Sequence, residues 1–506
     1  MSETAAPARS DSADGQRNNV LFVVLDTVRK SHLTPYGYDR PTTPALETFA
    51  AEARVYENAV AQAPWTLPSH ASMFTGLYPS EHAATQEDPY LADDIGTLAQ
   101  AVRASGAATA CYSSNAWITP YTRLTAGFDR QDNFFEVMPG DLLSGTLADL
   151  WQRINDNERL RSLADRLVEL GNTVHEYLAG GEGADTKTPE VIDRTIEFVD
   201  DEDDWFAFIN LMDAHLPVHP PDEYREEFAP GVDPDAVCQN SKEYNSGARD
   251  ISEQEFEDIR GLYDAEIRHI DAQLERLFDH LKQTGQWAET TVIVCADHGE
   301  LHGEHGLYGH EFCIYDPLVN VPLMLKAPGL EPGRDETTVE LLDLYHTTLD
   351  AAGATDAAAR HGCEAFDPAR SLLRETAREF ENGEYGFVEY HRPVVELNQL
   401  ETKAAEAGID LEEDSRFYSR MRAARRADAK YIRNERIPDE GYRLDEDPGE
   451  TETVGTDDPL VAEVEATLAA FEDRVGGEWD EVDDGDVLGE MSGDAKSRLQ
   501  DLGYME

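Results

Sequence analysis

Residues 19–26 read Asn-Val-Leu-Phe-Val-Val-Leu-Asp, six apolar side chains in a row that end on a carboxylate. A continuous apolar run of this length is typical of a parallel strand that is buried on both faces of a sheet. Open α/β sheets place their functional groups at the carboxyl ends of such strands. The stretch therefore predicts a central strand with Asp26 at the functional edge of the sheet.

Two later stretches repeat this pattern. Residues 205–212 form a mostly apolar run that is soon followed by His215, and residues 290–296 form another that is followed by Asp297 and His298. Because parallel strands end at the same edge of a sheet, we expect these acids and histidines to lie close together.

Helical patterns separate the predicted strands. They cover residues 41–53, the short segment 69–76, and a long amphipathic stretch within residues 256–284. The alternation predicts an α/β fold, with a large parallel or mixed central sheet sandwiched by helices. Short strands predicted at 385–390, 420–425, 430–433 and 442–445 add a small C-terminal antiparallel sheet.

The predicted organisation has one large domain and several smaller parts. It comprises a disordered tail (1–18), a catalytic α/β domain (19–375) with a helical insertion (139–190), a small α+β subdomain (376–470) and an acidic tail (471–506). The insertion is either a packing appendage or a substrate lid.

The composition is strongly acidic. The 506 residues include 103 Asp and Glu against 42 Lys and Arg, for a formal charge of −61 at pH 7, and only eight lysines. Self-repulsion of this size favours a salt-rich medium, since the Debye length falls to about 3 Å at 1 M salt. The charge argues against binding to nucleic acid, and the 40% apolar content excludes a disordered acidic chain.

Targeting signals and cysteine motifs are lacking in the sequence. The polar residues 1–19 hold no apolar segment of the kind that signal peptides carry, and no apolar run is long enough to span a membrane. The five cysteines show no metal-knuckle spacing. We therefore expect a cytoplasmic protein in a high-salt interior, without an integral membrane segment; the oligomeric state stays open.

The strongest local motif is the stretch Trp-Thr-Leu-Pro-Ser-His at residues 65–70. Pro68 suits the first turn of a helix, and Thr66 stands just before that helix. A hydroxyl there faces free N–H groups and the positive end of the helix dipole, which favour an alkoxide. Thr66 is accordingly either a nucleophile or a simple helix cap.

A second motif follows the third predicted strand. Residues 297–310 contain histidines at 298, 302, 305 and 310 between glycines at 299, 303, 306 and 309, so a loop is favoured over a helix. A loop rich in histidine and acids after a buried strand indicates metal ligation or anion binding.

These blocks resemble the sulfatase family of the alkaline phosphatase superfamily. The resemblance runs from about residue 19 to 475 and rests on short motifs in family order: Asp-Thr-Val-Arg at 26–29, Trp-Thr-Leu-Pro-Ser-His at 65–70, His-Leu-Pro at 215–217, Asp-His-Gly at 297–299, Val-Pro-Leu at 321–323 and Asp-Pro-Gly-Glu at 447–450.

The resemblance implies one divalent cation held by Asp26, Asp297, His298 and the hydroxyl of Thr66. Ca²⁺ is the first choice by family, and Mg²⁺, Mn²⁺ or Zn²⁺ also suit such ligands. The family's usual second acid is Thr27 here, so one ligand is lost or replaced by a hydroxyl.

The resemblance also implies roles for several histidines. His215 would contact the oxyanion group of the ester, and His310 stands roughly where many members carry a lysine with the same task. His70 or His302 would protonate the leaving group, and the sequence does not choose between them.

Thr66 is the departure that matters most. Family sulfatases carry a Cys or Ser that is oxidised to formylglycine, whereas a threonine has a methyl group on Cβ and cannot yield an aldehyde. We therefore expect a metal-dependent hydrolase of sulfuric or phosphoric esters of small molecules or glycans, with Thr66 as nucleophile. Alternatives are a phosphodiesterase or phosphotransferase acting on a sugar or lipid-linked substrate, and a non-catalytic binder of sulfated or phosphorylated glycan.

Overall fold

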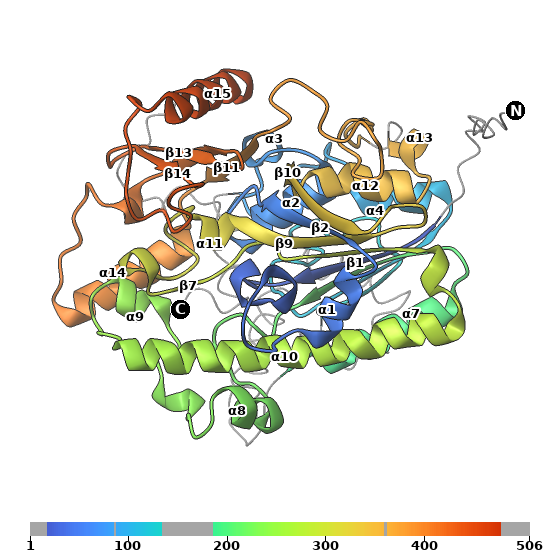
Figure 1. The fold of residues 1–506 in the computed structure, drawn as a ribbon, viewed down its shortest axis with the longest axis horizontal. Helices are drawn as coiled ribbons and strands as arrows, with labels where there is room; N and C mark the ends of the chain where they lie inside the picture. The colour runs from blue at the N-terminus through green and yellow to red at the C-terminus, as the bar shows by residue number, and fades with distance from the viewer. Residues whose placement is uncertain (1–17, 86–87, 134–185, 359–361, 477–506) are drawn as a thin grey trace, which may run out of the picture.

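An eight-stranded mixed sheet forms the centre of the molecule, with helices on both faces (Figure 1). The computed structural model describes residues 18–85, 88–133, 186–358 and 362–476. The strand order is β10-β2-β9-β6-β1-β5-β3-β4, and these strands span Gly333–Glu340, Arg54–Val60, Asn320–Lys326, Thr290–Cys295, Asn19–Leu25, Trp205–Leu211, Ala108–Ser113 and Arg130–Asp132. The predicted α/β architecture is confirmed.

The three strands predicted from their apolar runs lie side by side in the middle of this sheet. β1 pairs in parallel with β5 on one side and with β6 on the other. Its residues from Val20 to Leu25 are at most 1% exposed, as expected of a strand covered on both faces. Leu25 lies beside Leu211, and Val24 lies beside Cys295, so all three strands end at the same edge. The antiparallel strand β9, between β6 and β2, makes the sheet mixed.

Two groups of helices cover the sheet. The long helix α10 runs along one face together with α1 and α7, and α2, α4 and α12 cover the other (Figure 1). The helices span Pro44–Ala50 (α1), Thr66–Thr75 (α2), Leu98–Ser105 (α4), Thr188–Asp201 (α7), Glu253–Thr284 (α10) and Asp343–Ala351 (α12). Among the described residues, none of the helices combines the length and apolar character needed to cross a bilayer.

Two helix boundaries differ from the predictions. Helix α1 is shorter than predicted, because it starts only at Pro44, whose missing N–H is harmless in a first turn, and ends at Ala50 before β2. Helix α2 begins at Thr66, three residues earlier than predicted. Pro68 is tolerated within its first turn for the same reason, and Thr66 is therefore the first helical residue and not the residue before the helix.

The small C-terminal antiparallel sheet is present. It has the order β11-β12-β13-β14, with strands Gly386–Tyr390, Met421–Arg425, Ala429–Asn434 and Glu440–Arg443. Two helices accompany it, whose positions within the expected α+β subdomain we did not predict: α14 (Val394–Ala407) and α15 (Pro459–Val475), so residues 471–475 of the predicted acidic tail are helical. The predicted tails otherwise, and most of the predicted insertion 139–190, lie outside the described residues.

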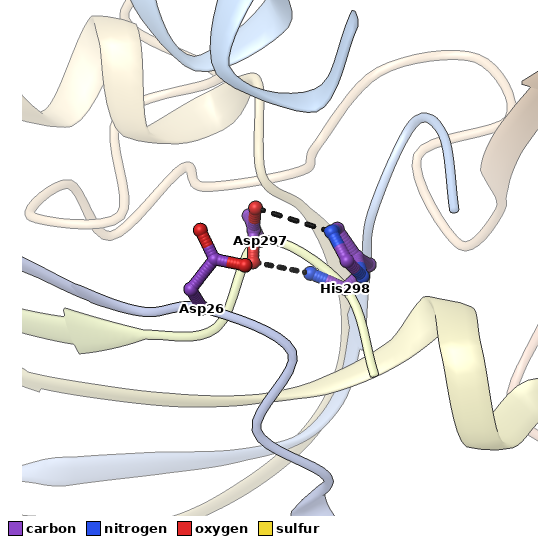
Figure 2. A group of neighbouring side chains, drawn as sticks. All are labelled: Asp26, Asp297 and His298. Atoms are coloured by element: carbon purple, nitrogen blue, oxygen red, sulfur yellow. Dashed lines mark hydrogen bonds and ion pairs between the residues drawn. The ribbon is translucent and has the colours of Figure 1, made fainter. Parts of the chain in front are cut away.

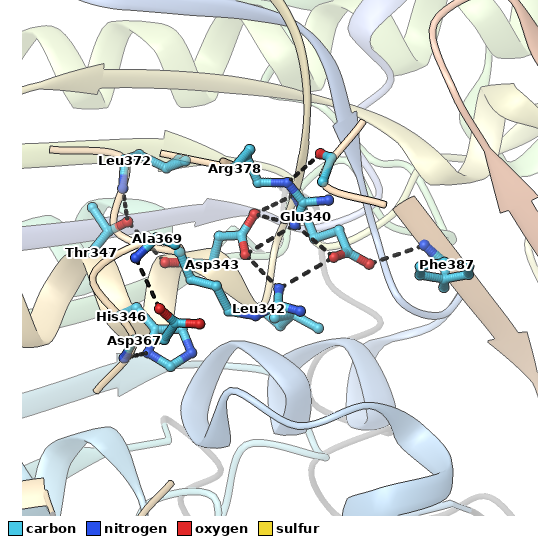
Figure 3. A network of polar contacts seen from close by, with 12 residues as sticks. Glu340, Leu342, Asp343, His346, Thr347, Asp367, Ala369, Leu372, Arg378 and Phe387 are labelled. Atoms are coloured by element: carbon cyan, nitrogen blue, oxygen red, sulfur yellow. Dashed lines mark hydrogen bonds and ion pairs between the residues drawn. The ribbon is translucent and has the colours of Figure 1, made fainter. Parts of the chain in front are cut away.

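A buried polar network ties the main sheet to the C-terminal sheet (Figure 3). Arg378 donates to Glu340 at the end of β10 (2.8 Å) and to Asp343 at the start of α12 (3.1 Å). Glu340 also accepts the backbone N–H of Phe387 in β11 at 3.0 Å. The three charged side chains are at most 6% exposed, so each charge depends on the others for compensation.

Replacing Arg378 with Met is expected to lower the free energy of unfolding by about 3 kcal/mol, because two buried carboxylates lose one of the two arginines that compensate them and keep only Arg370. Chemical denaturation at fixed salt measures this. Arg374→Met is the matched control, since Arg374 pairs with Asp350 at a half-exposed position and also removes one positive charge. The control is expected to cost less than about 1 kcal/mol. Equal losses in the two variants would contradict the assignment of a buried network.

Candidate active site

Two carboxylates and an imidazole converge at the edge where β1 and β6 end. Asp26 follows β1, and Asp297 and His298 follow β6. One ligand atom from each of the three lies within 4.8 Å of the others, and all three residues are fully buried. Figure 2 shows the Asp26 carboxylate turned toward Asp297 and His298. The structure therefore brings together the three side chains that were expected as metal ligands.

Two asparagines hold one side of the Asp26 carboxylate. The side-chain amides of Asn115 and Asn210 both donate to Asp26 Oδ2, at 2.7 and 3.0 Å. Asn210 is fixed in turn by the hydroxyl of Ser113, which donates to its amide oxygen at 3.1 Å. The other oxygen, Asp26 Oδ1, is buried without a hydrogen-bond partner.

Asp297 and His298 are held in the same one-sided way. Asp297 Oδ1 accepts the backbone N–H groups of Thr27 (3.3 Å) and His298 (3.0 Å). His298 Nδ1 donates to the carbonyl of Gly299 at 3.0 Å, which leaves a lone pair on Nε2. Asp297 Oδ2 and His298 Nε2 are again buried without a hydrogen-bond partner. Each of the three ligands thus keeps one bare acceptor atom for the same space.

The charges of Asp26 and Asp297 favour the binding of a cation between them and His298. Burial, and then the nearby Asp26 carboxylate, raise the pKa of Asp297 well above its usual range. Burial also lowers the pKa of His298, so its imidazole is neutral and able to ligate. A divalent cation would compensate the two carboxylates and fill the bare positions on the three ligands. The residues present therefore fit a divalent metal site, with mostly oxygen ligands.

Thr66 lies beside this cluster. Asn115 donates from the same Nδ2 atom to Asp26 Oδ2 and, at 3.3 Å, to Thr66 Oγ1, so the hydroxyl and the carboxylate lie within reach of one amide group. The N-cap position of α2 belongs to Trp65 and not to Thr66, which argues against a simple capping role for the hydroxyl.

A cavity of about 270 Å³ opens onto Thr66. The expected oxyanion contacts His215 and His310 both line it, and their rings lie 5.3 Å apart. Burial alone would lower the pKa of His310, but the carboxylates of Glu300, 3.2 Å from Nδ1, and Glu311 together outweigh burial and raise the pKa to about 9. His310 is therefore an imidazolium at neutral pH.

The two histidines considered as proton donors do not line the cavity, although His70 Nδ1 lies 3.5 Å from Asp297 Oδ2. His70 is fully buried in α2, donates from Nδ1 to the Thr66 carbonyl at 2.9 Å, and has its pKa lowered to about 4 by burial, so it is neutral. His302 packs its ring 4.7 Å from Tyr263 and 5.8 Å from His32. Neither residue lines the cavity, so the geometry disfavours both as general acids.

Comparisons with known proteins agree with this geometry. The family model described as Sulfatase matches residues 18–354. The chain belongs to the sulfatase family. It is 24% identical to the choline-sulfatase of Rhizobium meliloti over 91% of this chain and 87% of that one.

Solved structures show the same fold. The chain superposes on the phosphonate monoester hydrolase of Agrobacterium radiobacter with a TM-score of 0.62 and 20% identity, covering 91% of this chain and 95% of that one. Against a protein solved in complex with its substrate D-glucosamine-2-N,6-O-disulfate, the TM-score is 0.65 at 16% identity, with 93% and 100% covered. The predicted family is confirmed, and this member is an ester hydrolase; a purely binding role is set aside.

Sequence reasoning missed two asparagines of this sulfatase-family site and the backbone geometry of Thr27. Asn115 and Asn210 carry no local motif, although Asn115 follows a strand that ends at the functional edge. Thr27, where the family has an acid, donates its hydroxyl to the Asp26 carbonyl at 2.7 Å and its N–H to Asp297. Its φ of 58° is unusual for a β-branched residue.

Tyr263 of α10 holds this strained segment from outside. Its hydroxyl donates to the Thr27 carbonyl at 2.7 Å and accepts the Arg29 N–H at 2.8 Å, so one side chain fixes the backbone on both sides of Val28. Because the Thr27 N–H in turn orients Asp297, Tyr263 is a positioning residue for the metal ligands.

Asp297→Asn is expected to abolish binding of the divalent cation, since it removes one of the two compensating charges and a ligand. Elemental analysis after dialysis in high salt measures the loss. Asp271→Asn is the control, because Asp271 is equally buried but accepts backbone N–H groups at the start of α1. Retention of a stoichiometric cation by the Asp297 variant would refute the ligand assignment.

Tyr263→Phe is expected to weaken divalent-cation affinity by about 10-fold, since the Thr27 backbone loses its support. Calorimetric titration of the metal-free protein measures this directly. Tyr308→Phe removes an equally buried hydroxyl, which donates to the Cys238 carbonyl, and should leave the affinity unchanged. If both variants lose affinity equally, Tyr263 has no special role in positioning the ligands.

Proposed function

We propose that this enzyme hydrolyses phosphoric or phosphonic esters, with Thr66 as nucleophile and a divalent cation held by Asp26, Asp297, His298 and the Thr66 hydroxyl. The observation that carries the proposal is the position of Thr66 Oγ1, in the cavity wall and joined through the Asn115 amide to Asp26. Ca²⁺ is our first choice of cation because most of the proposed ligand atoms are oxygens.

The residues around Thr66 favour its alkoxide. The Asn115 amide donates to Thr66 Oγ1, and the residue stands at the amino end of α2, where the helix dipole favours negative charge. When bound, the cation would lower the pKa of the hydroxyl and polarise the ester. His70, which donates to the Thr66 carbonyl, and Ser69, whose hydroxyl donates to the Asp297 carbonyl at 2.8 Å, fix the first turn of the helix.

His310 and His215 supply donors for the non-bridging oxygens of the ester. His310 holds its proton on Nδ1 against Glu300, so its second N–H serves the substrate. His215 donates from Nδ1 to the Leu216 carbonyl at 2.6 Å, which fixes the ring, and its Nε2 donates to an ester oxygen when the ring is an imidazolium. Preorganised donors of this kind stabilise the charge that develops in the transition state.

Phosphorus is favoured over sulfur by the chemistry of threonine. The methyl group on Cβ prevents oxidation to an aldehyde, so the route through formylglycine is closed, whereas attack by an alkoxide needs no modification. The structural relative that hydrolyses phosphonate monoesters supports this choice. Sulfuric esters are the second candidate, because choline-sulfatase and the relative solved with a disulfated glucosamine act on sulfates.

The volume of the cavity bears on the size of the substrate, and the state of the cysteines bears on the compartment in which the enzyme acts. A cavity of about 270 Å³ suits a small-molecule ester or a terminal sugar more than a long polymer. The five cysteines are all free thiols, which supports action in a reducing, salt-rich cytoplasm.

Thr66→Ala is expected to reduce turnover of phosphate and phosphonate esters by at least about 10³-fold, because the covalent route is lost. The direct measurement uses the wild-type enzyme: turnover of a phosphate ester is quenched rapidly, and the accurate mass of the peptide that contains residue 66 is determined. A phosphorylated threonine establishes the nucleophile, and accurate mass distinguishes it from a sulfated one.

Thr75→Ala is the matched control. It removes a buried hydroxyl from the other end of the same helix, where the side chain donates to the Ala71 carbonyl at 2.7 Å. Thr66→Ser, which keeps a hydroxyl, should retain most of the activity. Full activity of Thr66→Ala on both sulfate and phosphate esters would overturn the assignment.

A further inference from the structure

Lys242 is a charged cavity residue to which neither the sequence motifs nor the proposed chemistry assigns a role. It lies on α9 (Ser241–Asn245) and lines the same cavity as Thr66, His215 and His310. Its side chain is 16% exposed, which is low for a lysine that is not part of a structural core.

Neighbouring carboxylates keep the ammonium group of Lys242 in its charged form. Its Nζ donates to Glu311, which also accepts the hydroxyl of Ser241 at 3.0 Å. Burial opposes both charges, but their attraction prevails: it lowers the pKa of Glu311 to about 2, and Glu311 and then Glu396 raise the pKa of Lys242 above its usual value. The neighbouring residue His310 is paired with Glu300 in the same way, so the cavity holds two compensated cations.

The lining of the cavity comes from two parts of the fold. Thr66, Asn115 and Met212 come from α2 and from segments that follow β3 and β5, at the edge of the main sheet. Lys242 comes from α9, and Glu396 and Gln399 come from α14, a helix that packs against α9. Because the attacking and leaving oxygens of a phosphoryl transfer lie roughly in line, the leaving group points away from Thr66, and Lys242 is a cationic donor in the lining that does not come from the elements around Thr66.

We propose that Lys242 donates a hydrogen bond from Nζ to the leaving-group oxygen, a role that rests on the proposed attack by Thr66. The hydroxyl proton of Thr66 passes to water, and as the bond from Thr66 Oγ1 to phosphorus forms, the bond from phosphorus to the leaving oxygen breaks and its electron pair stays on that oxygen. The ammonium group stabilises this negative charge, and water returns the proton to the departing alkoxide. A water oxygen then bonds to phosphorus, the bond from phosphorus to Thr66 Oγ1 breaks, and a proton of that water restores the hydroxyl of Thr66 as the phosphate or phosphonate leaves.

This role identifies a substrate class. An aryl oxide is stable enough to leave without help, whereas an alkyl or sugar alkoxide needs a fixed positive charge. The enzyme is therefore suited to esters of aliphatic or sugar alcohols, and the polar side chains of Glu396 and Gln399 would face the hydroxyl groups of such a leaving group.

The test compares Lys242→Gln with the wild type on phosphonate monoesters whose leaving groups range from 4-nitrophenol to a simple alkyl alcohol. We expect kcat/KM to fall by about 10²-fold for the alkyl ester and by only a few-fold for the 4-nitrophenyl ester. Equal losses of kcat/KM for all esters would mean that Lys242 binds the non-bridging oxygens, and this outcome would overturn the proposal. An unchanged kcat/KM for all esters would also overturn it.

Two further variants guard against a folding artefact. Lys242→Gln leaves Glu311 buried without its cation, so Lys242→Gln combined with Glu311→Gln removes both charges and should show the same dependence on the leaving group. Lys403→Gln is the control, since Lys403 joins α14 to α9 through Glu243 without lining the cavity and should leave kcat/KM unchanged. A wild type that is inactive on the whole series refutes the proposed function itself, whereas an active wild type with a flat response refutes only the role of Lys242.

Discussion

The rest of the site depends on two carboxylates, Asp26 and Asp297, that are buried within reach of each other. A buried charge costs several kcal/mol unless it is compensated, and two like charges raise that cost. The protein compensates one oxygen of each with fixed donors: side-chain amides for Asp26 and backbone N–H groups for Asp297. The remaining oxygens, together with His298 Nε2, have no compensation from the protein. Asn115, Asn210, the strained turn at Thr27 and the adjacent Tyr263 all serve to hold this pair of carboxylates in place.

The sequence reveals this pair because local patterns determine its position. An apolar run predicts a strand, adjacent parallel strands end together, and the acid that follows each strand must therefore come close to the others. The same local logic identifies Thr66, since Pro68 marks the first turn of a helix. The exact start of that helix was wrong by three residues because a proline within the first turn does not fix which residue precedes it.

The donors that complete the site were not predictable in this way. Asn115, Tyr263 and Lys242 come from a loop, a long helix and a short helix that are distant in sequence, and each makes contacts that only the folded chain creates. The missed helix α14 did leave a signal, since Val394, Leu397, Leu400 and Ala404 form a buried stripe at helical spacing. Its effect on the site, however, depends on how it packs against α9.

This division has a consequence for how the enzyme recognises an ester. The groups proposed to react stand at the edge of the main sheet, whose central strands β1, β5 and β6 are buried on both faces and tolerate little movement. The groups proposed to meet the leaving alcohol stand on α9 and α14, and the C-terminal sheet next to α14 is anchored to the main sheet by the ion pairs of Arg378, Glu340 and Asp343. A net charge of −61 would repel an anionic ester at low salt. Salt screens this repulsion but does not attract the ester. The cations His310 and Lys242 in the cavity lining provide the local attraction. With the roles proposed for Thr66 and Lys242, the reaction and the choice of alcohol would be carried by different parts of the chain, and substitutions in α9 and α14 would change the second without disturbing the buried carboxylate pair.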